Sequence, residues 1–176
     1  PTFYILVSVA TSLVTMALKT GAYFLTGSVG LLSDALESGV NLAAALVALA
    51  TLSYAHSGED DDHNFGHEKA EYFSSGIEGA LIFVAAGAII WAAIPRLLAP
   101  QPLAQVGVGL ALSVLATGAN LLCGWFLLKG AREHRSITLE ADAHHLLSDV
   151  WTTVGVIAAV AVVHFTGWLL LDPLIA

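Results

Sequence analysis

Two pairs of residues with metal-binding side chains, each with a four-residue spacing, lie inside long apolar stretches of the sequence. Glu37 precedes Asn41, and His145 precedes Asp149. Residues four apart lie above one another on one face of an α-helix. Two facing helices would therefore offer carboxylate, amide and imidazole groups to one ion, and these groups are good ligands for first-row divalent cations. The spacing predicts a four-ligand metal site; the alternative is that these polar groups hydrogen-bond the two helices to each other.

A second cluster of candidate metal ligands lies in and directly after a polar loop over residues 56–66, between two apolar segments. Its acidic run stands beside two imidazoles, and the candidate ligands are Asp60, His63 and His67. Such an arrangement can bind a metal ion close to a membrane surface. The alternative interpretation is an acidic loop that is only solvated.

Several ionisable residues fall well inside the apolar stretches. They are Lys19, Asp34, Glu37, Glu78, His144, His145, Asp149 and His164. A charge at the centre of a membrane span costs about 2.5–3.5 kcal/mol on insertion scales, so such residues face the interior of a helix bundle and usually mark a pathway. Asp34 and Asp142 fall near the same helix faces as the two pairs, and we interpret them as helix-packing or vestibule groups rather than as ligands.

The composition excludes an ordinary soluble domain. Of the 176 residues, 57% are hydrophobic and 11% are charged, whereas soluble domains carry about 25% charged residues. The apolar residues form long continuous blocks, which predict membrane-spanning helices rather than the short alternating strands of a barrel. The single cysteine, Cys123, excludes an intrachain disulfide and a cysteine-rich metal site. We interpret it as a small buried hydrophobic residue.

The apolar blocks predict an all-α membrane protein. A span needs about 20 residues to cross roughly 30 Å of hydrocarbon. The blocks place helices at about residues 1–25, 29–54, 67–94, 103–128 and 137–165, and a sixth helix begins at about residue 167. A basic connector over residues 129–135 joins the fourth and fifth helices. We expect both ends to be trimmed from a longer protein, with the sixth helix truncated.

The basic residues predict how the chain is oriented in the membrane. Lys69, Lys129, Arg132 and Arg135 border the connections after the second and fourth helices, while only Arg96 borders a connection on the other side. Because Lys and Arg are enriched in cytoplasmic loops, these two connections are expected to be cytoplasmic.

Three motifs resemble the cation diffusion facilitator family of cation efflux transporters. The stretch Gly27–Asn41 resembles the second helix of that family, Asp62–Glu71 resembles its loop into the third helix, and Ala141–Val150 resembles its fifth helix. The resemblance covers nearly the whole chain in the same order. It implies a homodimeric metal/proton antiporter with a six-helix transmembrane bundle of the cation efflux type, usually followed by a cytoplasmic metal-binding domain that is absent here.

The resemblance also implies roles for individual residues. The transport site falls on Glu37, Asn41, His145 and Asp149, the loop site falls on Asp60, His63 and His67, and a lysine that helps to join the dimer near the membrane surface falls on Lys69. Many relatives have Asp or His at the first of the transport positions and Asp at the second. Glu37 and Asn41 depart from that pattern, and this departure bears on the choice of metal.

Together the residues and the resemblance predict a secondary active transporter that exports a divalent transition-metal cation from the cytoplasm in exchange for protons. Zn²⁺ is the first choice, because one imidazole and two carboxylates suit it and because it dominates the resembling family; Mn²⁺, Fe²⁺, Cd²⁺ and Co²⁺ are alternatives. We expect the protein in the lipid bilayer of a bacterial inner (cell) membrane, with no nucleic-acid partner. The rival from another class is a membrane-embedded metalloenzyme, but the sequence has no His-Glu-x-x-His motif.

Overall fold

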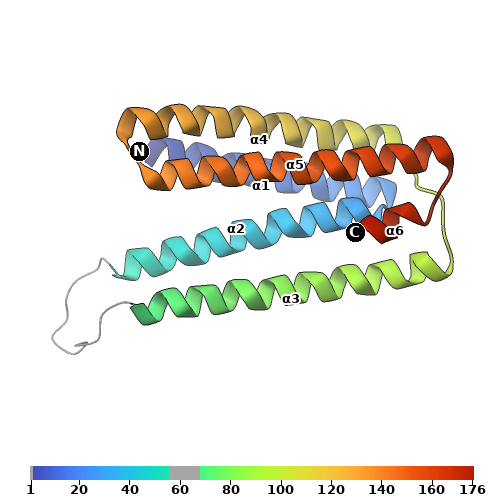
Figure 1. The fold of residues 1–176 in the computed structure, drawn as a ribbon, viewed down its shortest axis with the longest axis horizontal. Coiled ribbons are helices and arrows are strands. Elements are labelled where there is room, and N and C mark those ends of the chain that lie inside the picture. Colours follow the sequence, from blue (N-terminus) through green and yellow to red (C-terminus); the bar gives the residue numbers. More distant parts are fainter. Residues whose placement is uncertain (1, 56–67) are drawn as a thin grey trace.

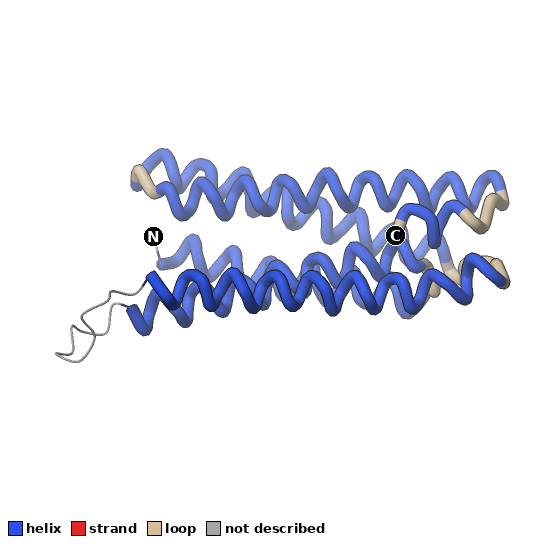
Figure 2. Tube along the Cα trace, turned by 60° about the horizontal axis from the view of Figure 1, so that its bottom comes forward, coloured by secondary structure: helices blue, strands red, loops and turns tan. Residues whose placement is uncertain are grey.

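The computed structural model describes residues 2–55 and 68–176, and this part of the chain is an antiparallel helix bundle (Figure 1). Its helices are α1 (Thr2–Thr26), α2 (Val29–Ala55), α3 (Glu68–Leu98), α4 (Val106–His134), α5 (Ile137–Thr166) and the short α6 (Leu171–Ile175). The described residues lie in helices or in the short loops and turns that join them, and no strand occurs among them (Figure 2). The predicted all-α membrane fold is confirmed.

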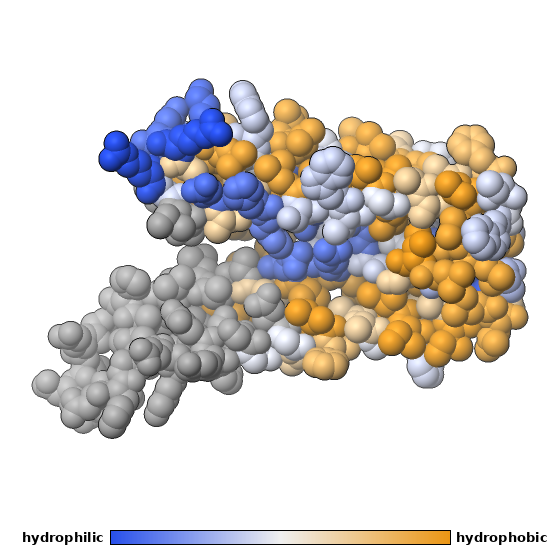
Figure 3. Space-filling view, viewed as in Figure 1, coloured by the Kyte–Doolittle hydropathy of each residue, from blue (hydrophilic) through white to orange (hydrophobic). Residues whose placement is uncertain are grey.

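Four helical segments in the described part of the chain are long and apolar enough to cross a membrane. They are Phe3–Thr26, Gly79–Leu98, Val106–His134 and Leu139–Thr166. Large apolar side chains cover the outside of the bundle, as expected for a surface that faces lipid: Phe83, Trp91 and Leu98 are each 82% exposed. The orange surface in Figure 3 shows the same distribution.

In Figure 1, helices α4 and α5 lie above α2 and α3, and α1 lies behind α5. Helix α4 packs extensively on both α1 and α5, whereas α2 packs mainly on α1 and α3 and touches α5 over only a short stretch. The α2–α5 boundary is therefore the loosest of the contacts that α2 makes with the long helices.

Two apolar clusters form the core, one toward each end of the bundle. The first contains Ala22, Leu31, Val106 and Val160, so it joins α1, α2, α4 and α5 near the N-terminal end of α2. The second contains Cys123, Leu127, Ala143 and Leu146, which all belong to α4 and α5. Helix α2 is thus anchored in the core near its start and not in the second cluster. The interpretation of Cys123 as a small buried hydrophobic residue agrees with its 6% exposure.

The connections between helices differ from the expected ones in two places. Helix α4 runs through the stretch 129–134 that we expected to be a connector, and it ends at Arg135 with φ 48°. Basic residues in a last turn interact favourably with the helix dipole, so they extend a helix rather than end it. Helix α3 continues past Pro95 to Leu98, because neighbouring groups in a membrane bundle compensate for the hydrogen bond that a proline removes.

Candidate metal centre

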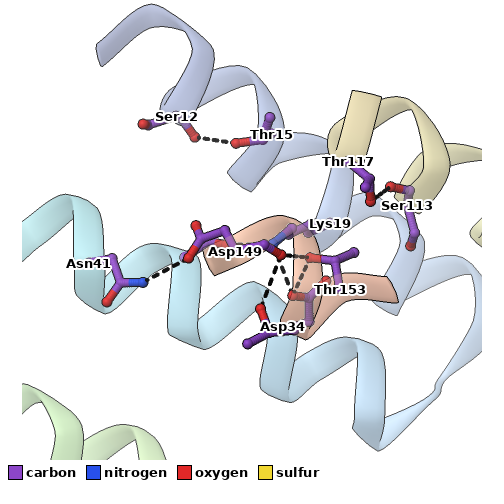
Figure 4. Close-up of polar contacts among 11 residues, drawn as sticks. Ser12, Thr15, Lys19, Asp34, Asn41, Ser113, Thr117, Asp149 and Thr153 are labelled. Carbon is purple, nitrogen blue, oxygen red and sulfur yellow. Dashed lines mark hydrogen bonds and ion pairs between the residues drawn. The ribbon is translucent and has the colours of Figure 1, made fainter. Parts of the chain in front are cut away.

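The structure brings one member of each predicted pair into contact across the α2–α5 boundary. The Asn41 Nδ2 atom donates a hydrogen bond to Asp149 Oδ1 at 3.4 Å, a length at which such a bond is weak. Asp149 is 7% exposed, and Asn41 is half-buried. Both residues lie about midway along their helices, where Figure 4 shows their side chains pointing toward each other.

The other two members of the quartet, Glu37 and His145, lie one turn before Asn41 and Asp149 on their helices and are exposed. Glu37 interacts electrostatically with Asp149 and with His145, and Asp149 interacts in turn with His145. Figure 3 shows hydrophilic surface set between apolar surfaces in this region. The two pairs therefore face a shared space that is open to water.

The four side chains do not close around a single point. Within residues 2–55 and 68–176, no group of three His, Cys, Asp or Glu side chains is close enough to hold a metal ion. The Asn41–Asp149 contact joins the two pairs, and Glu37 and His145 stand apart from it. Binding a metal would require the α2 and α5 faces, or these side chains, to move together.

The structure does not describe the side chains of the remaining predicted site residues. Asp60, His63 and His67 lie outside the described residues. Lys69 belongs to the first turn of α3, and its side chain is also outside the description. Of the other ionisable residues, His144 and His164 are exposed and Asp142 is half-buried.

Sequence reasoning missed an ion pair beside the quartet. The Lys19 Nζ atom lies 2.9 Å from Asp34 Oδ1 and donates a second hydrogen bond to Ser38 Oγ at 2.9 Å. Lys19 and Asp34 are each 1% exposed. The signal was present in the turn at Gly27: Lys19 stands eight residues before it and Asp34 seven residues after it. Two helices joined by a short turn bring such positions to one level.

The start of α2 is fixed by a residue from α6. The Asp172 carboxylate accepts hydrogen bonds from the backbone N–H of Val29 at 2.8 Å and of Gly30 at 3.3 Å. The Ser28 hydroxyl donates to the same carboxylate. An anionic group at a helix N-terminus satisfies free N–H groups and interacts favourably with the helix dipole. This cap and the first core cluster hold the same end of α2.

Comparison with known proteins places the whole bundle in one family. Residues 5–176 match the cation efflux transmembrane domain. An uncharacterized transporter of Synechocystis is 56% identical over 173 residues, which cover 98% of this chain and 56% of that protein. The zinc transporter ZitB of Escherichia coli is 31% identical over 153 residues, covering 87% and 48% respectively.

A cadmium, cobalt and zinc/H(+)-K(+) antiporter of Bacillus subtilis is 31% identical over 151 residues, which cover 86% of this chain and 48% of that protein. The chain thus spans about half the length of the curated relatives it matches.

Proposed function

Because the chain belongs to the cation efflux family, we propose that it exports a divalent transition-metal cation, Zn²⁺ first of all, from the cytoplasm in exchange for protons. The ion binds between α2 and α5, and its ligands are Glu37, Asn41, His145 and Asp149. The observation that carries this proposal is the Asn41–Asp149 contact, which joins the two predicted ligand pairs midway along the bundle.

The orientation of Asn41 supports its role as a ligand. An amide that donates through Nδ2 keeps its carbonyl oxygen free, and this oxygen is the atom that binds a cation. Donation to Asp149 therefore leaves both the Asn41 oxygen and the second Asp149 oxygen available to an ion. With Glu37 and His145 the site offers three oxygen-bearing groups and one imidazole, which suits Zn²⁺ and also Mn²⁺, Fe²⁺, Cd²⁺ or Co²⁺.

The loose α2–α5 boundary supports alternating access. Transporter sites near the middle of the bilayer open to one side and then to the other as helices rock around them. Helix α2 is held at its start by Asp172 and by Leu31 in the first core cluster. A movement of its other end would therefore change access to the site from the side where the α2–α3 and α4–α5 connections lie, which we assign to the cytoplasm.

The proposal extends to the further features that the family resemblance implies. We include a homodimer with Lys69 near the contact between subunits. We also include a peripheral metal site at Asp60, His63 and His67 that adjusts entry or stability rather than carrying transport.

Metal flux through the reconstituted protein tests the proposed function. We expect the protein in sealed liposomes to move Zn²⁺ across the membrane at a rate well above that of protein-free liposomes, measured with an enclosed zinc-sensitive dye. The rival function, a membrane-embedded metalloenzyme, would instead show metal-dependent hydrolysis without flux. Absence of flux with Zn²⁺, Mn²⁺, Fe²⁺, Cd²⁺ and Co²⁺ would contradict the proposal.

Replacing Asn41 with Asp should change metal selectivity. The variant adds a carboxylate beside Asp149, so we expect every divalent ion to bind about tenfold tighter or more at an effective dielectric of about 20, and the rank order of transported metals to shift. Competition of Cd²⁺ and Mn²⁺ with Zn²⁺ uptake measures this. A competition profile identical to that of the parent would show that Asn41 does not touch the ion.

A further inference from the structure

A buried ammonium group lies at the centre of the bundle, beside the proposed transport site. Lys19 is 1% exposed although it belongs to α1, a helix long enough to span a membrane. Its Nζ atom bonds to Asp34 Oδ1 and to Ser38 Oγ, both on α2 and both at 2.9 Å (Figure 4). A charge buried so deeply is costly unless it is paired, so its place here calls for an explanation.

Asp34 depends on Lys19 for neutralisation. Its Oδ1 atom accepts from Lys19 and also from the Thr153 hydroxyl of α5 at 2.9 Å. Its Oδ2 atom is buried and has no hydrogen-bond partner among the described residues. A carboxylate needs several donors to be stable away from water. Thr153 contributes a neutral hydrogen bond, so Lys19 supplies the compensating charge.

This ion pair acts on the proposed ligands. Asp34 lies three residues before Glu37 on α2, and Thr153 lies four residues after Asp149 on α5. Lys19 interacts electrostatically with both Glu37 and Asp149. Asp34, which carries a negative charge, also interacts electrostatically with Glu37 and Asp149. Three carboxylates and one ammonium group therefore share one region between α1, α2 and α5.

Resting on the function proposed above, we propose that Lys19 is a tethered counter-cation that sets the charge of the transport site. The Lys19 and Asp34 charges cancel. The carboxylates of Glu37 and Asp149 then leave a charge of minus two, which one divalent ion neutralises. Without the ammonium group the site would carry three uncompensated carboxylates. It would hold a divalent ion too tightly for rapid release, because the attraction grows with each added charge.

The alternative is a purely structural role, in which the network only pins α1, α2 and α5 together. The two roles predict different directions for the change in Zn²⁺ affinity when a partner is removed. Loss of a structural contact weakens binding whichever partner is removed, and removal of both partners is at least as harmful. If the pair sets the charge of the site, removal of the Lys19 charge tightens metal binding and removal of the Asp34 charge weakens it. Removal of both charges leaves the net charge of the site, and therefore its affinity, close to that of the parent.

The test is a double-mutant cycle on the pair, with Zn²⁺ affinity measured by calorimetry on the protein in nanodiscs at pH 8, which keeps carboxylates ionised. We expect Lys19→Met to tighten Zn²⁺ binding by about tenfold or more and to slow its release from liposomes. We expect Asp34→Asn to weaken binding by a similar factor, an effect of the size that one charge exerts on a divalent ion at separations near 10 Å and an effective dielectric of about 50, which lies between the value for water and that for a protein surface. The double variant should return to within about threefold of the parent.

Two controls separate charge from packing. Thr153→Val removes the neutral hydrogen bond to Asp34 and keeps both charges, so its affinity should stay within about threefold of the parent. Lys19→Arg keeps the charge with different geometry, and parent-like affinity is expected. If neither single variant can be isolated folded, Lys19→Arg and the double variant are compared with the parent, and all three should bind alike.

Three results overturn the inference. They are single variants that both weaken binding, single variants that both leave it unchanged, and a double variant at least tenfold weaker than the parent. Failure of the parent itself to bind or transport any divalent ion would overturn the proposed function together with this inference. Normal transport by the parent combined with any of the three results above overturns the inference alone.

Discussion

Asp149→Ala is expected to lower zinc flux by about a hundredfold or more, to the level of protein-free liposomes. The substitution removes one of only two carboxylates from the proposed quartet and also the acceptor for Asn41. Loss of a group that merely supports a metal ligand costs about ten- to a hundredfold in affinity or activity, and a ligand itself should cost at least as much. No other change to a single described side chain removes as much of the site.

The fold should survive this substitution. Among the described residues, the one side-chain hydrogen bond of Asp149 that connects two helices is the 3.4 Å contact with Asn41. The two apolar clusters that join the helices contain neither residue. Removing a buried carboxylate also removes the cost of burying it. Expression, membrane insertion and thermal unfolding should therefore stay close to those of the parent.

The matched control for Asp149→Ala lies on the same helix. Asp142→Ala makes the same chemical change seven residues earlier, at a half-buried position, and should keep most of the flux. Flux is measured at saturating and subsaturating Zn²⁺ to separate lost affinity from lost turnover. Full flux of Asp149→Ala under both conditions would show that the quartet is the wrong set of residues.

The sequence predicted the helices because membrane spans obey a simple length and polarity rule. Apolar blocks of at least 20 residues leave few choices in lipid, where every backbone group needs an internal partner. The end of α3 and the start of α4 were less predictable. The residue before α4 is Gln105, which makes no side-chain cap, so the usual Ser, Thr, Asp or Asn signal is missing there.

Helix faces could be predicted from spacing, but contacts between helices could not. The four-residue spacing of Glu37 with Asn41, and of His145 with Asp149, correctly places each pair on one helix face. Whether Asn41 meets Asp149 depends on the rotation of α2 and α5 about their axes. Packing of α2 on α1 and α3, and of α5 on α4, sets that rotation. The short turn at Gly27 places Asp34 at the level of Lys19 in the bundle, but the sequence does not show that the two side chains face each other, for the same reason.

A pH gradient, acid on the side that receives the metal, is expected to drive zinc transport, and zinc transport is expected to move protons the other way. Metal ligands must be deprotonated, so metal and protons compete for the site. The carboxylates of Glu37 and Asp149 interact across the α2–α5 boundary. Neighbouring carboxylates repel each other when no cation lies between them, so we expect protons to replace the metal when it leaves the site.

The direction of the pH effect follows from this competition. Lower pH favours the protonated, empty site and weakens zinc binding, whereas higher pH favours the ionised site and strengthens it. Zinc therefore binds more readily from the less acidic side and is released to the more acidic side. His145 adds a second group for which protons and metal compete, since an imidazole must give up its proton before it can bind the ion. His145→Ala should consequently change the pH dependence of flux as well as the affinity.

Proteoliposomes that contain a pH-sensitive dye measure both effects. Zinc added outside should change the internal pH as it enters, and an imposed pH gradient should speed or slow zinc movement according to its direction. The exposed His144, next to His145 in sequence, provides the matched His→Ala control and should keep the parent pH profile. Rapid zinc flux without a pH change, and without a response to the gradient, would exclude exchange for protons. The α2–α5 site would then belong to a uniporter or a channel.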